Sequence, residues 1–303
     1  MTILITGSSG FIGKRLYAYA KKQGFNIKTV SRKTVNERNA YLCNLEIDSL
    51  PSAAFDGVDT VFHLAGFAHD LSPSPQNTTK YSELNLKATM SIANQAVENK
   101  VKHFVFISST KAGQSGDVDD INLTNHPVDS LGGFYAKTKK QAELGLSDLS
   151  STTDMTISIV RPSLVYGPNV KGNIKRLNNF LDQGLTFSLP HLENKRSMVH
   201  VDDLVRAIFL ISQRKEKEIR TYIITDLHEY STSEIINTLS GLKKYYFKVK
   251  VPRFLLIFIL NMLKIFKSKI SKIFLDDVYY STNYREINFK PELRLEDINE
   301  TIF

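Results

Sequence analysis

The sequence predicts an α/β protein in which a doubly wound parallel sheet is followed by a smaller, mixed C-terminal part. Apolar runs of strand length alternate with helical segments through the first two thirds of the 303 residues. A glycine-rich turn separates the first apolar run from the first helical segment, and the regular alternation stops near residue 165. Such alternation places parallel strands in one sheet with helices on both of its faces.

The individual elements follow from apolar periodicity and from the turn residues between them. Strands are expected at 3–6, 26–31, 40–43, 59–65, 102–109 and 156–162, and helices at 11–24, 79–99 and 134–149. Beyond 165, a Gly/Pro loop leads into a helix near 174–183, a strand near 197–201 and a helix from 202 onwards. These later segments are expected to form a smaller part that interleaves with the first.

Composition narrows the class of protein. Hydrophobic residues make up 42% of the chain and charged residues 23%, which is ordinary for one large or two coupled globular domains. The single cysteine, Cys43, excludes an internal disulfide, and with no Cys/His cluster it predicts no metal site and a reducing, cytoplasmic location. The N-terminus has no basic leader, and the apolar stretch 254–260 falls well short of the ~20 residues that span a bilayer.

The net charge of +8 is concentrated in two lysine-rich stretches, 241–250 and 264–272. Such stretches attract anionic ligands, nucleic acid or membrane surfaces, but a solvated face on a lysine-rich protein is the simpler interpretation. The sequence has no zinc finger, RNA-binding signature or recognition helix, so no nucleic-acid partner is predicted. Peripheral membrane contact through 251–272 is the weaker alternative to a substrate-domain helix with its lysines in water.

The segment TGSSGFIG places Gly7, Gly10 and Gly13 between the first strand and the first helix. Glycine lets the turn tighten and lets the backbone approach a pyrophosphate, and the helix N-terminus supplies N–H groups with a positive dipole. This context predicts a Rossmann-type dinucleotide site. Residues 1–165 are therefore expected to form the dinucleotide-binding domain, and 166–303 mainly the substrate-binding part.

The end of the second strand bears on the choice between NAD and NADP. An acidic residue about 20 positions after the glycines would bind the ribose 2′-hydroxyl. Ser31 occupies that place and is followed by Arg32 and Lys33, two cations that suit a 2′-phosphate. NADP(H) is therefore favoured, and NAD(H) is the alternative.

The segment YAKTK contains a tyrosine and a lysine four residues apart, Tyr135 and Lys139, which a helix would place on one face. Two other pairs, Tyr17/Lys21 and Tyr246/Lys250, share this spacing, so context must decide. Tyr17/Lys21 lies on the helix after the glycine loop, and Tyr246/Lys250 has no strand with a terminal hydroxyl before it. The pair at 135 and 139 follows the strand that ends in SST, and it returns to the carboxyl edge where ligands bind in such folds.

Several motifs in this order resemble the extended short-chain dehydrogenase/reductase family, of the NAD-dependent epimerase/dehydratase type. They are TGSSGFIG, FHLAG (62–66), SST (108–110), YAKTK, RPSLVYGP (161–168) and KRSMVHVDDL (195–204). The resemblance runs to about residue 207 and is nearest to nucleotide-sugar epimerases and 4-keto-sugar reductases. Two positions depart from the family pattern: Ala88-Thr89 replaces a Gly-Thr pair, and Asn44-Leu45 replaces an Asp-aliphatic pair near the adenine.

The resemblance implies roles for matching positions. Catalysis would fall to Thr110, Tyr135 and Lys139, with Ser109 as the alternative hydroxyl. The cofactor would be bound by Gly7, Ser9, Gly10, Phe11, Ile12, Gly13, Arg32, Asn44, Leu45, Leu64, Ala65, Gly66, Ser108, Tyr135 and Lys139. The substrate would be bound by Ser109, Thr110, Asn173 and Arg196, the last two at its diphosphate. Asn85 matches a structural asparagine, and a homodimer formed through the helices near 79–99 and 134–149 is a further implication.

In such a reaction a hydride moves between a sugar carbon and the nicotinamide while a proton leaves or joins the sugar oxygen. Free tyrosine has a pKa of about 10, so a nearby lysine ammonium and the nicotinamide charge are expected to lower the pKa of Tyr135. The hydroxyl of Thr110 would hold the reacting oxygen. His63, in an apolar strand, is expected to be packed or to line the cofactor site rather than to act as a base.

Three enzyme reactions compete. A 4,6-dehydratase would carry acidic residues directly after Thr110. The chain has Lys111-Ala112-Gly113 there, with no carboxylate, so this reaction is disfavoured. The two cations after the second strand favour a 4-keto reductase that uses NADPH on a UDP-2-acetamido-2,6-dideoxy-4-keto-hexose. A UDP-glucose or UDP-N-acetylglucosamine 4-epimerase with bound NAD is the close alternative. A dinucleotide-binding sensor without turnover is the alternative from another class, and the intact Thr110, Tyr135 and Lys139 set argues against it.

Overall fold

The structure is a computed structural model that describes residues 1–32, 39–68, 75–113, 131–170, 172–182, 185–188, 194–241, 247–250 and 276–297. The chain forms two compact units. The first contains Met1–Pro162, Leu204–Ile224 and Ser281–Lys290, and the second contains Ser163–Asp203, Thr225–Tyr280 and Pro291–Phe303. The first unit thus includes two segments that lie well beyond residue 165 in the sequence.

The first unit is built on a seven-stranded sheet in which all neighbouring strands are parallel. Its strands are β1 (Thr2–Thr6), β2 (Asn26–Ser31), β3 (Ala40–Leu42), β4 (Thr60–His63), β5 (His103–Ile107), β6 (Thr156–Pro162) and β10 (Arg220–Ile224), in the order β10-β6-β5-β4-β1-β2-β3. Strand β1 pairs with both β2 and β4, so the strand order reverses at this point. Ligands bind outside the carboxyl ends of the strands at such a reversal, and the predicted doubly wound sheet is confirmed.

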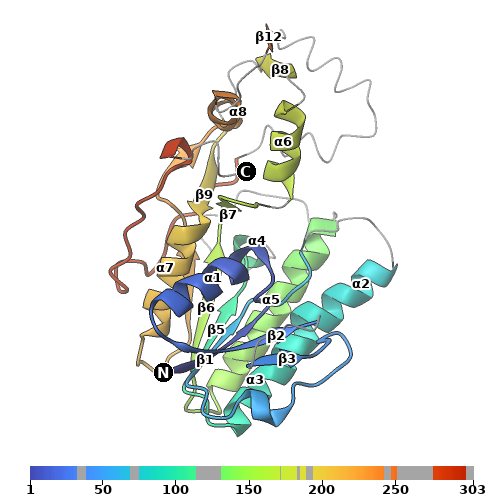
Figure 1. The fold of residues 1–303 in the computed structure, drawn as a ribbon, viewed down its shortest axis with the longest axis vertical. Helices are drawn as coiled ribbons and strands as arrows, with labels where there is room; N and C mark the ends of the chain where they lie inside the picture. Colours follow the sequence, from blue (N-terminus) through green and yellow to red (C-terminus); the bar gives the residue numbers. More distant parts are fainter. Residues whose placement is uncertain are drawn as a thin grey trace. The chain divides into compact units, whose positions relative to one another are not determined.

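Helices cover both faces of this sheet. Successive side chains of a strand point to opposite faces, so each strand contributes to both packing layers. On one face Leu4, Val61 and Phe104 belong to a buried cluster with residues of α3 (Ala88–Glu98) and α5 (Leu131–Ser150). On the other face Phe62 packs against Phe209, which also meets α1 (Phe11–Lys22) and belongs to α7 (Val201–Ser212). Figure 1 shows α3 and α5 together on one side of the strands and α1 on the other.

The helix expected at 79–99 is interrupted. It consists of α2 (Pro75–Tyr81), a π-helix (Ser82–Lys87) and α3. The fully buried Asn85 lies in the π-helical turn, where its side chain bonds the backbone N–H and C=O of Phe67 and the hydroxyl of Thr138. A π-helical turn frequently marks a functional region, and here it brings the asparagine to the loop after β4 and to α5.

The second unit contains two small sheets. In the first, β9 (Arg196–His200) lies between β7 (Leu164–Tyr166), to which it is parallel, and β11 (Glu229–Tyr230), to which it is antiparallel. In the second, β8 (Leu185–Ser188) pairs with β12 (Phe247–Lys250). The unit also contains α6 (Asn173–Leu181), α8 (Thr232–Gly241) and a 3₁₀ turn at Leu295–Asp297. Within the residues that the structure describes, no helix combines the length and the apolar character needed to cross a membrane.

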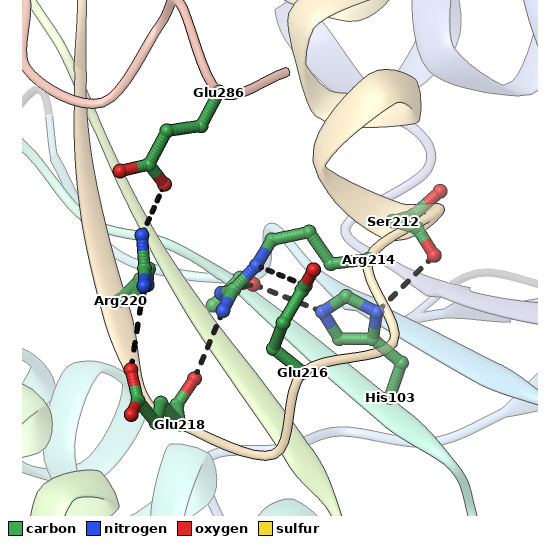
Figure 2. Close-up of polar contacts among 8 residues, drawn as sticks. His103, Ser212, Arg214, Glu216, Glu218, Arg220 and Glu286 are labelled. Atoms are coloured by element: carbon green, nitrogen blue, oxygen red, sulfur yellow. Dashed lines mark hydrogen bonds and ion pairs between the residues drawn. The ribbon is translucent and has the colours of Figure 1, made fainter.

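A polar network lies near the amino-terminal ends of β5, β6 and β10, away from the carboxyl edge (Figure 2). The ring of His103 contacts the carbonyl of Ser212 through Nδ1 at 3.2 Å and the hydroxyl of Ser158 through Nε2 at 3.0 Å. Arg214 donates to the same Ser158 hydroxyl at 3.4 Å. Because the carbonyl can only accept, Nδ1 carries a proton. Burial lowers the pKa of His103 to about 4, so the ring is neutral near pH 7.

Candidate active site

The glycine loop is shaped so that only glycine fits at two of its positions. Gly7 has φ +72°, and a Cβ on it would lie 2.7 Å from the backbone nitrogen of Ala65. A Cβ on Gly13 would lie 2.1 Å from the carbonyl oxygen of Gly7. The turn is closed by a hydrogen bond of 2.9 Å from Gly10 N–H to Gly7 C=O, and α1 begins at the next residue, Phe11. This close approach of backbone at a helix N-terminus fits the binding of a pyrophosphate.

A buried chain of side chains connects this loop to the helices on the far side of β4. The hydroxyl of Thr6 lies 2.7 Å from Nδ1 of His63, and Nε2 of His63 lies 2.9 Å from the hydroxyl of Thr89, which donates to the Asn85 carbonyl. Since Thr89 gives its proton to Asn85, Nε2 of His63 must be the donor in the second contact. His63 is therefore a packed, neutral residue, and burial together with the Lys139 charge lowers its pKa to about 3.

Tyr135 and Lys139 both lie on α5, on the face directed at the end of β5. The Lys139 ammonium donates to the carbonyl of Ile107 at 2.8 Å, and its nitrogen lies 4.5 Å from the centre of the Phe106 ring. Tyr135 is half-buried, and its hydroxyl shares a hydrogen bond with Ser109, two residues beyond Ile107. The structure thus brings Ser109, Tyr135 and Lys139 to one place at the carboxyl edge of the sheet.

The other predicted hydroxyl and the loop after β4 lie close by. Thr110 is buried and begins the short helix α4 (Thr110–Gly113). A Cβ on Gly66 would lie 3.4 Å from the Lys139 nitrogen, so the FHLAG segment runs beside this lysine. Ala65 N–H donates to the hydroxyl of Thr6 at 3.3 Å, which joins the segment to the strand that leads into the glycine loop.

The protonation of the pair differs in part from the prediction. Burial raises the pKa of Tyr135 to about 12, against the lowering effect of the Ser109 hydrogen bond, so the chain's own groups hold it as a phenol. In the chain by itself, burial therefore outweighs the lowering of the Tyr135 pKa that the sequence predicts. Burial lowers the pKa of Lys139 to about 8, and the charge of Glu143 opposes that shift.

The adenosine end of the predicted site lies at the ends of β2 and β3. The exposed Arg32 side chain is 3.5 Å from a carboxylate oxygen of Glu46. Asn44 holds the turn that carries this glutamate, because its side-chain oxygen accepts from Glu46 N–H at 3.3 Å. Leu45 is partly buried against the core cluster. Lys33 lies outside the described residues.

The two predicted diphosphate ligands lie in the second unit. Asn173 is the first residue of α6. Arg196 begins β9, is half-buried, and donates from Nε to the hydroxyl of Thr232 at 3.4 Å. Burial lowers the pKa of Arg196 against the effects of Asp277 and Asp276. Asp277 and Asp276 therefore act on the charge of Arg196 from within its own unit.

The two competing Tyr/Lys pairs have different surroundings. Tyr17 is half-buried and Lys21 is exposed on α1. Lys250 lies in strand β12, so its spacing from residue 246 is not that of a helix, and residue 246 itself lies outside the described part of the chain.

Two acidic residues were missed by the sequence reasoning. One is Glu46 beside Arg32. The other is Glu143, which is buried and bonded to Ser108 and Arg161. The spacing of Tyr135, Lys139 and Glu143, in steps of four along α5, is a signal that points to this second residue. Among the described residues, no group of three or more His, Cys, Asp or Glu side chains is arranged to hold a metal ion.

Comparisons with known proteins identify relatives of this chain. The model of the NAD dependent epimerase/dehydratase family matches residues 3–224. A UDP-glucose 4-epimerase of Vibrio cholerae is 30% identical over 259 residues, which cover 83% of this chain and 79% of that protein. An N-acetyl-alpha-D-glucosaminyl-diphospho-ditrans,octacis-undecaprenol 4-epimerase of Escherichia coli O157:H7 is 29% identical over 212 residues, covering 68% of this chain and 61% of that protein.

Solved structures share the fold at lower identity. MoeE5 in complex with UDP-glucose and NAD superposes with a TM-score of 0.76 at 21% identity, covering 98% of this chain and 95% of that one. A UDP-glucose 4-epimerase of Thermotoga maritima with UDP-glucose gives 0.75 at 22% identity, covering 99% and 97%. The match of the family model over most of the chain, the relative at 30% identity and the glycine loop beside the Tyr135–Lys139 pair lead to one conclusion: this chain belongs to the NAD-dependent epimerase/dehydratase family of enzymes.

Proposed function

We propose that this chain is a nucleotide-sugar oxidoreductase that acts at C4 of a UDP-linked sugar, and that its reaction is 4-epimerisation with NAD. The observation that carries the proposal is the meeting of Ser109, Tyr135 and Lys139 at the sheet edge next to the glycine loop. The Vibrio cholerae relative, a UDP-glucose 4-epimerase, supports the choice of reaction.

The glycine loop supplies a fit for the cofactor. Gly7 and Gly13 leave room where a side chain would collide with backbone, and the N–H groups at the start of α1 would bind the pyrophosphate. A bound NAD would supply the acceptor and donor of the hydride that leaves and rejoins the sugar carbon. The residues that would hold its nicotinamide half are Lys139, which lies beside Gly66, and Tyr135.

The chain's own groups manage the proton. As a phenolate, which the positive charges of Lys139 and of a bound nicotinamide would favour, Tyr135 would take the proton of the C4 hydroxyl as the sugar is oxidised. The phenol formed in this way would return the proton to the keto oxygen as the sugar is reduced. The Ser109 hydroxyl would hold the reacting oxygen beside the phenol, since it already meets Tyr135 in the structure. The Lys139 cation would stabilise the phenolate that takes up this proton.

A 4-keto reductase that uses NADPH is the second candidate. Arg32 favours it, because an exposed guanidinium after β2 suits a 2′-phosphate and Ser31 supplies no carboxylate there. Glu46 weakens this argument because it lies beside the guanidinium and offsets its charge. On this reading the substrate is a UDP-2-acetamido-2,6-dideoxy-4-keto-hexose and the product leaves after one hydride transfer.

One experiment separates the two reactions. The purified protein is denatured and the released nucleotide is identified by mass spectrometry, and the native protein is then incubated with UDP-glucose or UDP-N-acetylglucosamine. Retained NAD together with formation of the 4-epimer supports epimerisation, and Tyr135→Phe is expected to abolish the product. An empty protein that oxidises NADPH only with a UDP-4-keto sugar would favour the reductase. Dinucleotide binding with no turnover of any of these sugars would overturn both.

A further inference from the structure

Glu143 is a buried carboxylate that the reaction described above does not use. Its side chain is only 3% exposed. It accepts three hydrogen bonds: from Ser108 Oγ at 2.5 Å, from Arg161 Nε at 3.0 Å and from the Arg161 terminal nitrogen at 2.6 Å. The two-pronged arrangement with arginine is the strong form of this interaction.

Glu143 and its two partners, Ser108 and Arg161, join the elements that carry the proposed catalytic groups. Ser108 directly precedes Ser109 at the end of β5, and its N–H donates to the Val160 carbonyl at 2.7 Å. Arg161 lies on β6, and Glu143 lies one helical turn after Lys139 on α5. The carboxylate therefore ties the end of β5, the end of β6 and the catalytic face of α5 to a common point.

Two buried cations lie around one carboxylate at this point. Lys139 and Arg161 are both buried cations, and the carboxylate whose charge acts on Lys139 is that of Glu143. A buried ion pair adds little net stability because desolvation of the ions offsets their attraction, whereas loss of one partner leaves an uncompensated charge. The arrangement is therefore better explained by its effect on the neighbouring lysine than by stability.

We propose that Glu143 is a positioning residue for Lys139: held by Arg161 and Ser108, its carboxylate keeps the lysine charged and fixes α5 against the strand that carries Ser109. The inference rests on the roles proposed above for Tyr135 and Lys139. Other charged or titratable groups act on these residues from each side. Lys140 on α5 and Arg161 on β6 lie near Glu143, the His63 ring from β4 is coupled to Lys139, and Tyr81 from α2 is coupled to Tyr135.

The test is the titration of Lys139 itself, measured without substrate. Protein labelled with ¹³C at the lysine ε carbons is titrated by NMR, and the Lys139 signal is assigned by its loss in Lys139→Arg. In Glu143→Gln the amide oxygen can still accept from Ser108 Oγ and Arg161 Nε, but the amide NH2 cannot accept from the Arg161 terminal nitrogen and the charge is gone. We expect the Lys139 midpoint to fall by about one pH unit. A midpoint that stays where it is in the wild type would overturn the proposal.

Two controls isolate the charge. Glu83 and Lys87 form a surface pair with the same four-residue spacing, and their carboxylate and ammonium groups are 2.7 Å apart. Glu83→Gln removes that carboxylate and should leave the Lys139 midpoint unchanged. Should Glu143→Gln not fold, the double variant Glu143→Leu/Arg161→Met replaces the buried pair with apolar groups, a change that proteins often tolerate. The Lys139 midpoint is expected to fall in that variant as well, and an unchanged midpoint there would equally contradict the proposal.

An activity measurement distinguishes this inference from the proposed reaction. For Glu143→Gln, the alkaline limb of the pH profile of kcat should shift to lower pH by the same interval as the Lys139 midpoint. The KM for the sugar should stay unchanged. A uniform loss of kcat at every pH would indicate a structural role only and would refute the inference. A Lys139 shift in a protein that turns over no nucleotide sugar would leave the inference standing and overturn the reaction.

Discussion

The hydroxyl of Ser109 shares a hydrogen bond with the phenol of Tyr135, across the gap between the end of β5 and the face of α5. The Ser109 oxygen also accepts from Lys111 N–H at 3.3 Å. A hydroxyl has one proton to donate, so with Lys111 as its donor Ser109 is free to give that proton to Tyr135. The sequence placed this role on Thr110, with Ser109 as the alternative, and the contact with Tyr135 leads us to propose Ser109.

The two hydroxyls can be separated by substitution. Ser109→Ala should lower kcat about a hundredfold because it removes the group that aligns the reacting oxygen with Tyr135. Thr110→Val, which keeps the buried volume at the start of α4, should lower kcat less than about tenfold. Steady-state kinetics on the accepted UDP-sugar, with thermal unfolding to verify folding, make the comparison. The reverse order of losses would return the role to Thr110.

Activity should fall as Lys139 loses its proton. The pKa of Lys139 is lowered to about 8 by burial, so the cation to which we assign the stabilisation of the Tyr135 phenolate is present below that pH and disappears above it. We expect kcat to be level near neutrality and to decline above pH 8. The profile of Lys139→Arg should lack this limb, because arginine stays protonated throughout. A wild-type profile that remains level to pH 10 would show that the charge of Lys139 is not required.

The pair Arg32–Glu46 should control the choice between NAD and NADP. Glu46 offsets the charge of the guanidinium, with 3.5 Å between the two groups, and would repel a 2′-phosphate bound to Arg32. Glu46→Gln is therefore expected to tighten NADP binding about fivefold, because a surface ion pair that competes for Arg32 is lost. The affinity for NAD should stay within about twofold of the wild-type value. Arg32→Gln should weaken NADP alone. Calorimetric titration of both variants with both nucleotides gives the answer, and equal effects on NAD and NADP would rule out this role.

Stability should rise with pH through the range in which His103 titrates. Burial lowers the pKa of His103 from its usual 6.5 to about 4, so the unfolded chain binds the extra proton between these values. The neutral His103 ring contributes on the order of 3 kcal/mol to the free energy of unfolding relative to low pH. This contribution is complete above pH 6.5 and is lost as the pH falls towards 4. Urea unfolding at a series of pH values should show a smaller slope in this window for His103→Gln than for the wild type.

A matched substitution tests whether the position matters. His228→Gln alters a partly exposed histidine of the second unit and should leave the network around His103 unchanged. Equal slopes for His103→Gln and the wild type would mean that the network around His103 in Figure 2 does not hold the ring neutral.

Much of the first unit could be predicted from the sequence because its signals are local. Strand and helix periodicity, the glycines at 7, 10 and 13, and the four-residue spacing of Tyr135 and Lys139 all depend on neighbours in the chain. The resemblance to a family added roles for these positions, and the doubly wound fold indicated the carboxyl edge of the sheet as the place of the site.

The tertiary structure decided what depends on residues far apart in the chain. Ser108 and Glu143 are separated by 35 positions and Glu143 and Arg161 by 18, so no local pattern pairs them. The partner of Arg32, the break in the helix at Asn85 and the addition of β10 to the sheet have the same origin. Local sequence determined which groups the chain offers for chemistry, whereas packing decided which of them meet, because burial and hydrogen bonding are settled only when distant segments come together.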